Sequence, residues 1–286
     1  MILNFKQTLL LLLMFVTTIT VFSQDRRTCG TDPFMEQKLQ DPVFLKQYQI
    51  KQKKIKNELL KIKSGNFESK LATLIIPVAV HYPEGLEQQR GCLEDLARSQ
   101  VEVLNKDYTA TNSDIINWGA ASGFYPGTNT AAFDVKFVLA NKNHPINTDD
   151  DLVEGGPAVT IGYNFGGGGD QDVKWAGYKN FLVKTIAGGI LGYSPLGGSI
   201  SNGAAVVMSP QAFGSSDIAS GCNSNGVSFI PGAPYDLGRT VTHELGHYFT
   251  LNHTFQGGCA GNNDGHDDTP AIPTSSGGCP SNGSVP

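Results

Sequence analysis

The stretch from Thr242 to His253, near the end of the chain, constrains the fold more than any other part of the sequence. It contains His243-Glu244-Leu245-Gly246-His247, and a third histidine follows six residues after the second. Because positions four apart share one face of an α-helix, His243 and His247 can bind one metal ion together. His253 lies too far along to continue that face, so the chain must turn to bring it back.

Three neutral imidazoles with one open position are typical of a catalytic zinc site rather than a closed structural one. Glu244 lies beside the first ligand, where a carboxylate can act as general base on a water molecule. We therefore predict a zinc-dependent peptidase with His243, His247 and His253 as ligands and Glu244 as the catalytic group. The alternative, surface histidines on an ordinary helix, explains the third histidine less well.

Composition narrows the class of protein. The 286 residues suit one main domain with appendages, and 40% apolar with 16% charged residues argues against wholesale disorder. A net charge of -5 gives no sign of a nucleic-acid partner. We expect protein or peptide substrates and no nucleic acid.

The first residues indicate export. Lys6 precedes an apolar run that starts at Leu9 and continues to Phe22, and Ser23 is a small residue suited to a cleavage site. This pattern predicts a signal peptide over residues 1–23. No later stretch reaches the ~18 apolar residues of a membrane span. We expect a secreted, extracellular protein with no stable membrane anchor after cleavage.

Residues 24–70 differ from everything that follows. The segment 46–63 is rich in lysine, lacks glycine and ends at Ser64-Gly65, which predicts an exposed helix with a thin apolar stripe. Three interpretations stay open for it: a solvated linker, a helix for a membrane surface or acidic partner, and a pro-segment helix that shields the enzyme.

From residue 71 the chain has the pattern of a globular α+β domain. We expect strands over 74–82, 133–139, 178–184 and 204–208, with a helix over 92–105. Strand, helix and strand in this order suggest a crossover unit. Residues 166–169 predict a flexible glycine-rich loop, and residues 191–195 a turn. His81 is expected to be a strand-end histidine rather than a metal ligand.

The metal-binding motif itself is expected on an amphipathic helix. Asp236 is a reasonable N-cap. Leu237, Val241, Leu245 and Phe249 fall four residues apart and predict the stripe that packs on the core. The histidines project from a different face.

With the third histidine included, the long motif resembles that of the metzincins. Among these, the chain is similar to the pappalysin family, especially its secreted bacterial members. The resemblance extends over most of the chain and rests on the segments 27–31, 76–81, 103–108, 238–247, 253–255 and 264–270.

The resemblance implies a metzincin-like catalytic domain over residues 71–286, with a twisted mixed β-sheet, a backing helix and a zinc-binding active-site helix. It implies that Cys29, in Cys29-Gly30-Thr31, binds the zinc of a latent zymogen whose pro-segment is residues 24–70. Five cysteines leave at least one without an internal partner, which this role for Cys29 would explain. The resemblance also implies a calcium site at Asp264 and Thr269, for which an ordinary Asx-rich turn is the alternative. Cys259–Cys279 is the disulfide we expect, with partners beyond the end of this chain as the alternative.

Two departures from the family pattern are visible. Thr250 stands where metzincins usually have glycine and pappalysins often have asparagine. No methionine follows His253, so the methionine turn is missing and we expect an incomplete catalytic domain. This absence keeps a second class open, an inactive metal-holding adhesion or binding protein. A zinc aminopeptidase would take its third ligand from a distant helix, which His253 disfavours.

Overall fold

The computed structural model describes residues 28–65, 72–125, 127–259, 264–266, 269 and 271–275. The predicted signal peptide and Cys279 lie outside these residues. In the part of the chain that is described, no helix combines the length and the apolar character needed to cross a membrane.

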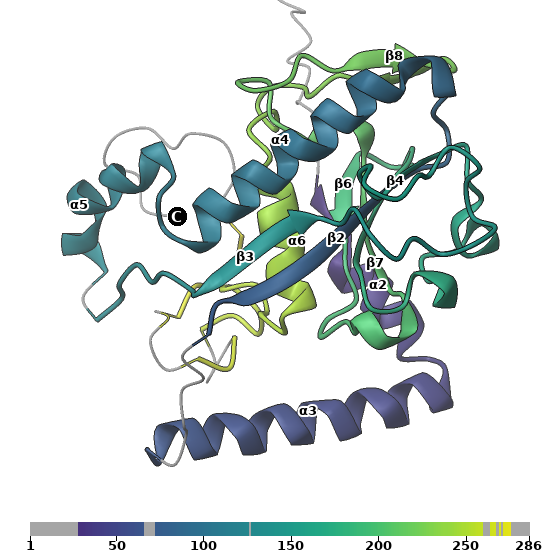
Figure 1. Ribbon diagram of the computed structural model, residues 1–286. Helices are drawn as coiled ribbons and strands as arrows, with labels where there is room; N and C mark the ends of the chain where they lie inside the picture. The colour runs from purple at the N-terminus through teal and green to yellow at the C-terminus, as the bar shows by residue number, and fades with distance from the viewer. Residues whose placement is uncertain are drawn as a thin grey trace, which may run out of the picture.

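A mixed β-sheet forms the centre of the molecule (Figure 1). Its strands are β1 (Thr28–Cys29), β2 (Leu74–Tyr82), β3 (Val135–Leu139), β4 (Val159–Ile161), β5 (Lys179–Val183), β6 (Ile190–Tyr193) and β7 (Ala205–Met208). The order is β1-β6-β7-β5-β2-β3, and β4 also pairs with β2, beyond the end of β3. Among the described strands of this sheet, β6 and β7 form the one antiparallel pair. The predicted α+β class and mixed sheet are confirmed.

The helices are α2 (Thr31–Lys38), α3 (Pro42–Lys63), α4 (Arg90–Tyr108), the short α5 (Trp118–Ala121) and α6 (Arg239–Tyr248). Helix α4 connects β2 to β3, which pair in parallel from Leu74↔Val135 to Val78↔Leu139. The crossover read from the sequence is therefore present, and α4 is the backing helix. It runs diagonally above β2 and β3 in Figure 1.

Apolar side chains fill both faces of the sheet. On one face, Val78, Val80 and Phe181 pack with the buried residues of α4 and α6. On the other, Ala79, Leu182 and Val207 pack with Phe165 and Trp175, which come from the loops. Because α6 shares its core with the central strands, the motif helix is held on a rigid platform.

His81 lies near the end of β2, where burial lowers its pKa to about 4. One of its ring nitrogens contacts the Thr160 hydroxyl at 2.9 Å and the other the Asn180 side-chain oxygen at 3.1 Å. Both nitrogens are thus engaged within the sheet.

One local prediction was wrong. Residues 190–193 form strand β6, although the sequence suggested a turn at 191–195. Gly192 lets β6 approach the neighbouring strand β7 closely and does not form a turn. A Cβ atom on it would lie 2.9 Å from Met208 Sδ and 3.0 Å from the Val207 carbonyl oxygen. The glycine-rich loop predicted at 166–169 contains a 3-10 turn over Phe165–Gly168, in which Gly166 N–H donates to Asp172 Oδ2 at 3.0 Å; its flexibility stays a prediction.

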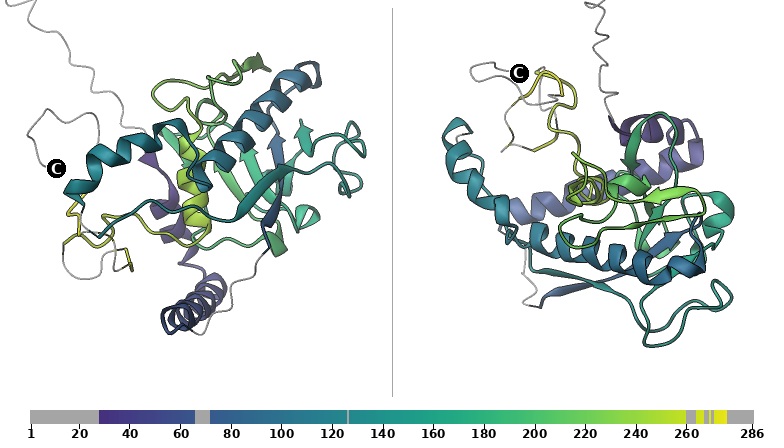
Figure 2. Two further views of the ribbon diagram at one scale, coloured as in Figure 1. Left: turned by 60° about the vertical axis from the view of Figure 1, so that its left-hand side comes forward. Right: turned by 90° about the horizontal axis from the view of Figure 1, so that it is seen from above.

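Helix α3 lies along one side of the sheet body in Figures 1 and 2, and no residue of it is buried. Its N-cap is Asp41, whose carboxylate accepts from Val43 N–H at 2.8 Å. Lys51 anchors α3 to the body by donating to the carbonyl oxygens of Gly197 and Gly198. The exposed, lysine-rich helix predicted from composition is present, and the lysine contact ties it to the body.

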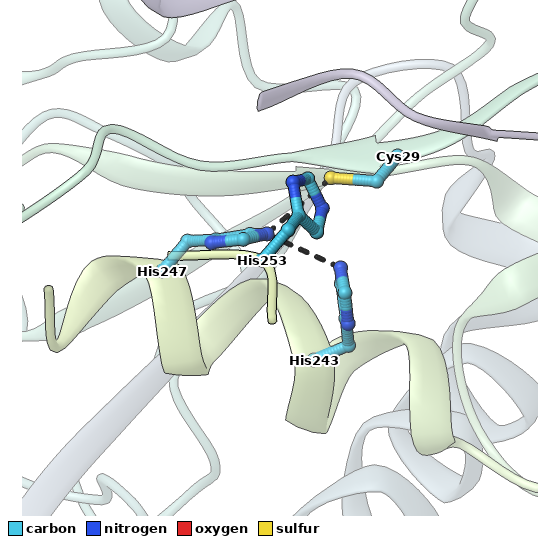
Figure 3. Close-up of side chains that lie close together, drawn as sticks. All are labelled: Cys29, His243, His247 and His253. Carbon is cyan, nitrogen blue, oxygen red and sulfur yellow. Dashed lines mark hydrogen bonds between the residues drawn. The ribbon is translucent and has the colours of Figure 1, made fainter. Parts of the chain in front are cut away.

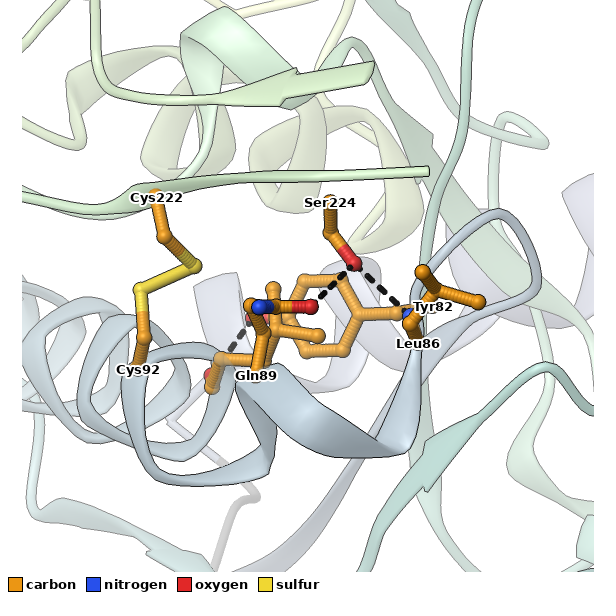
Figure 4. The surroundings of a disulfide bond; sticks show 7 residues. Tyr82, Leu86, Gln89, Cys92, Cys222 and Ser224 are labelled. Carbon is orange, nitrogen blue, oxygen red and sulfur yellow. Dashed lines mark hydrogen bonds between the residues drawn. A yellow bond between two sulfur atoms is a disulfide. The ribbon is translucent and has the colours of Figure 1, made fainter. Parts of the chain in front are cut away.

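A disulfide that the sequence did not reveal joins Cys92, in the first turn of α4, to Cys222 in β8 (Cys222–Ser224). Figure 4 shows the bridge beside Ser224, whose hydroxyl accepts from Leu86 N–H at 2.7 Å. Strands β8 and β9 (Val227–Phe229) form an antiparallel hairpin. The bridge spans 130 residues of sequence, a separation at which spacing says nothing about pairing.

Candidate active site

Helix α6 presents the motif, but its ends differ from the prediction. Its N-cap is Gly238, in a left-handed conformation with φ 73°, and no side chain caps it. Asp236 instead accepts a hydrogen bond from the Ser216 hydroxyl at 2.9 Å. Val241 and Leu245 are fully buried, whereas Leu237 and Phe249 are 42% and 41% exposed. The packing stripe is therefore shorter than the sequence suggested, because both of its ends lie beyond the helix.

A tight turn after α6 brings the third histidine back. Thr250 has φ 81°, the left-handed region that disfavours β-branched residues. Its N–H donates to the His247 carbonyl at 2.9 Å, and Leu251 N–H donates to the Gly246 carbonyl at 3.0 Å. These two bonds reverse the chain at the helix end. His253 consequently lies over the face that carries the other two histidines (Figure 3).

Cys29, His243, His247 and His253 converge, with one ligand atom from each lying within 4.8 Å of every other (Figure 3). His243 Nε2 and His247 Nε2 are 3.2 Å apart, and Cys29 Sγ is 3.5 Å from His247 Nε2. Tetrahedral zinc bonds imply separations of about 3.3 Å between two nitrogens and about 3.6 Å between nitrogen and sulfur. The donor set therefore fits zinc in both chemistry and spacing.

The ring of His247 is oriented for metal binding. Its Nδ1 lies 2.7 Å from the Leu251 carbonyl oxygen, which can only accept, so Nδ1 carries the proton. The Nε2 lone pair then faces the cluster, as a metal ligand requires. Desolvation, with smaller contributions from the neighbouring His247 and His253, lowers the pKa of His243 to about 4, so its ring is neutral at neutral pH.

Glu244 is fully buried beside the cluster. Burial raises its pKa to about 7, although hydrogen bonds from Cys29 and Thr31 oppose the shift. The Thr31 hydroxyl lies 3.0 Å from Glu244 Oε2, and Oε1 has no hydrogen-bond partner among the described residues. A buried carboxylate with one free oxygen is well suited to accept a proton from a molecule entering the site.

Cys29 approaches from strand β1, which pairs in parallel with the edge of β6. Burial and then the nearby Glu244 raise the pKa of its thiol to about 12. A cation among these ligands reverses this preference, because a coordinating thiol is deprotonated. Thr31 N–H donates to Cys29 Sγ at 3.4 Å, which directs the sulfur toward the histidines.

Two contacts beside Cys29 were not foreseen from the sequence. The Thr31 hydroxyl donates to Glu244 Oε2 and also accepts from Ser194 N–H at 3.0 Å. The Asp32 carboxylate lies 3.2 Å from His253 Nδ1, close enough for electrostatic attraction but without hydrogen-bond geometry. The Cys-Gly-Thr pattern was the available signal, but it does not indicate which group Thr31 contacts.

No contact between the two residues of the predicted calcium site is seen among the described residues. Asp264 is buried, and its Oδ1 accepts from His266 N–H at 2.9 Å. Thr269 is half-buried, and Asp264 belongs to no converging group of His, Cys, Asp and Glu side chains within the described ranges. The calcium site stays a prediction, as does the Cys259–Cys279 bridge, since Cys279 lies outside the described residues.

Comparisons with known proteins agree with this geometry. Residues 195–282 match the peptidase M43 family, described as pregnancy-associated plasma protein-A. Extracellular metalloprotease 1 of Coccidioides posadasii is 29% identical over 259 residues, covering 89% of this chain and 74% of that relative. A promirolysin mutant from Tannerella forsythia has a similar fold, with a TM-score of 0.62 and 26% identity over 89% of this chain and 80% of that one.

The segment that carries the metal-binding motif thus matches the pappalysin family, and the relatives that resemble the rest of the chain are also metalloproteases. Mature mirolysin from Tannerella forsythia in complex with a cleaved peptide is also similar, with a TM-score of 0.55 and 26% identity, over 74% of this chain and 77% of that one. The predicted metzincin-type fold is thereby confirmed, including its mixed sheet and active-site helix.

Proposed function

We propose that this protein is a secreted zinc endopeptidase made as a zymogen, with the metal held by His243, His247 and His253. The observation that carries the proposal is the convergence of these three side chains with Cys29 at separations that suit zinc. Protein or peptide substrates follow from the family and from the cleaved peptide bound to mirolysin. Export is supported by the apolar segment 9–22 and by the relative's name, extracellular metalloprotease.

When bound, zinc would supply a Lewis acid that polarises the scissile carbonyl. The residues of this chain would perform the proton transfers. Glu244 would accept the proton of the attacking water through its free oxygen and return it to the leaving amine. Its raised pKa, about 7, suits a group that must both take and release a proton near neutral pH.

Latency is the second part of the proposal, with residues 24–70 as pro-segment and residues 71–286 as catalytic domain. Cys29 would fill the fourth ligand position, and the Thr31 hydroxyl would occupy the oxygen of Glu244 that faces it. Strand β1 would also block the edge of β6. Together these contacts would engage the metal, the base and the strand beside them.

Substitution of Glu244 by Gln tests the mechanism. The variant keeps the size of the side chain and the three histidines but cannot accept a proton. We expect it to bind zinc stoichiometrically, measured by metal analysis, and to lose at least ~100-fold in cleavage of a denatured protein after removal of the pro-segment. Cleavage at the wild-type rate would contradict the role of Glu244.

The wild-type protein, after removal of the pro-segment, tests two other activities. A zinc aminopeptidase would cleave amino-acid amides rather than the interior of a denatured protein. A metal-holding binding protein would retain zinc but cleave neither substrate. The buried carboxylate of Glu244 beside the metal ligands favours the endopeptidase, because a purely structural metal site has no use for it.

A further inference from the structure

We propose that Asp107, at the end of α4, is a positioning residue that fixes the first turn of α6 and so holds His243 in place as a metal ligand. The inference rests on the proposed function, since it concerns how one of the proposed ligands is oriented. It adds a residue from the backing helix, 136 positions before His243 in the sequence, to the apparatus of the site.

His243 is held differently from the other two histidines. His247 donates to the Leu251 carbonyl, and His253 faces the Asp32 carboxylate. For the His243 ring, the only hydrogen-bond partner that the described residues provide is His247 itself. Metal-binding histidines are usually oriented by a partner on the far ring nitrogen. The direction of His243 therefore depends on where the backbone of the first helical turn is placed.

That first turn lacks the usual local support. The N-cap is a glycine, and no side chain caps the free N–H groups of α6. The Asp107 carboxylate supplies a negative charge near this end, where it interacts favourably with the helix dipole. Its side chain is only 5% exposed, so water weakens the interaction little.

The two oxygens of Asp107 hold two different residues of the turn. Oδ1 accepts from the Arg239 guanidinium, and Oδ2 accepts from the Thr242 hydroxyl at 2.6 Å. Tyr108 adds a third bond from α4, with its hydroxyl donating to the Thr242 carbonyl at 3.3 Å. Because Thr242 immediately precedes His243, these bonds limit both rotation and sliding of α6 at the ligand.

Asp114 provides a matched control. It lies on the other side of Arg239, 2.6 Å from its guanidinium, but its side chain is 53% exposed. An exposed ion pair of this kind contributes little, because solvent screens it. It makes no hydrogen bond to Thr242 among the described residues, so it should not influence His243.

The experiment compares Asp107→Asn and Asp114→Asn in the full chain. Zinc affinity is measured by competition with a chromophoric chelator, and the visible spectrum is recorded after substitution with Co²⁺. We expect Asp107→Asn to bind zinc about 10–100-fold more weakly, the range found when a residue that orients a ligand is lost. Its Co²⁺ spectrum should shift, whereas Asp114→Asn should match the wild type in both measurements.

Unchanged zinc affinity and an unchanged Co²⁺ spectrum in Asp107→Asn would overturn the proposal, even if the metal-free variant unfolded more easily. If that variant does not fold, Thr242→Val decides, because it keeps the side-chain volume and removes only the donor to Asp107. Weaker zinc binding by Thr242→Val would support the positioning role, and wild-type affinity would overturn it. Failure of the wild type to bind zinc would overturn the proposed function itself.

Discussion

Replacing Thr250 by Asn should stabilise the protein. Thr250 has φ 81° in the turn between α6 and His253. For a residue with a Cβ, this region costs roughly 1–2 kcal/mol, and asparagine tolerates it better than a β-branched residue. The Thr250 γ-methyl lies against Gly197, 3.0 Å from where a Cβ on that glycine would be. Because Thr250 is only half-buried, losing this methyl costs about half of the ~0.8 kcal/mol of a buried methylene.

The balance favours asparagine by about 0.5–1 kcal/mol, which corresponds to a rise of roughly 2 °C in Tm for a domain of this size. Thr250→Gly should be nearly neutral, because relief of strain is offset by the ~0.4–1 kcal/mol of extra freedom that glycine has in the unfolded chain. Thr250→Val keeps the β-branch and is the matched control, with no gain expected.

The measurement is urea unfolding of the four proteins at one fixed concentration of free zinc, because metal binding itself adds stability. Equal slopes of the unfolding transitions would show that the unfolded states are comparable. The strain argument is refuted if Thr250→Asn is no more stable than Thr250→Val.

Two further predictions concern the proposed zymogen and its base. Cys29→Ala should raise cleavage of a peptide substrate by the full chain before the pro-segment is removed, whereas Cys259→Ala should not; unchanged latency in Cys29→Ala would count against Cys29 as the blocking ligand. In metal-free protein, the raised pKa of Glu244, about 7 against an ordinary 4.5, means that the fold favours the protonated carboxyl. Its contribution to stability is therefore full below about pH 4.5 and is lost as the pH rises through about 7, so the stability of Glu244→Gln relative to wild type should increase over this window. Urea unfolding of both proteins at pH 5 and pH 8 measures the change, and a constant difference would contradict the burial of an uncompensated carboxylate.

Local patterns account for the parts of the fold that sequence reasoning identified correctly. The run from Leu74 to Tyr82 is a strand at the residues expected, because a short, continuous apolar segment rich in β-branched residues is typical of a buried strand. Helix α4 is likewise visible in its spacing, and its buried side chains include Leu93, Leu96 and Leu104. Strand β6 was missed because it is short and contains Gly192 and a following Ser194-Pro195, which look like a turn until Met208 is placed beside them.

The sequence by itself determined the chemistry of the site. Spacing places His243 and His247 on one helical face, and the third histidine requires a turn that the structure provides at Thr250. Only the tertiary structure decided which distant residues meet them. Asp107 on α4 and Thr31 beside β1 reach α6 across 135 and 213 residues, and the Cys92–Cys222 bridge spans 130. The physical reason is that helical spacing acts over a few residues, whereas contacts of this length depend on how the packed sheet brings whole segments together.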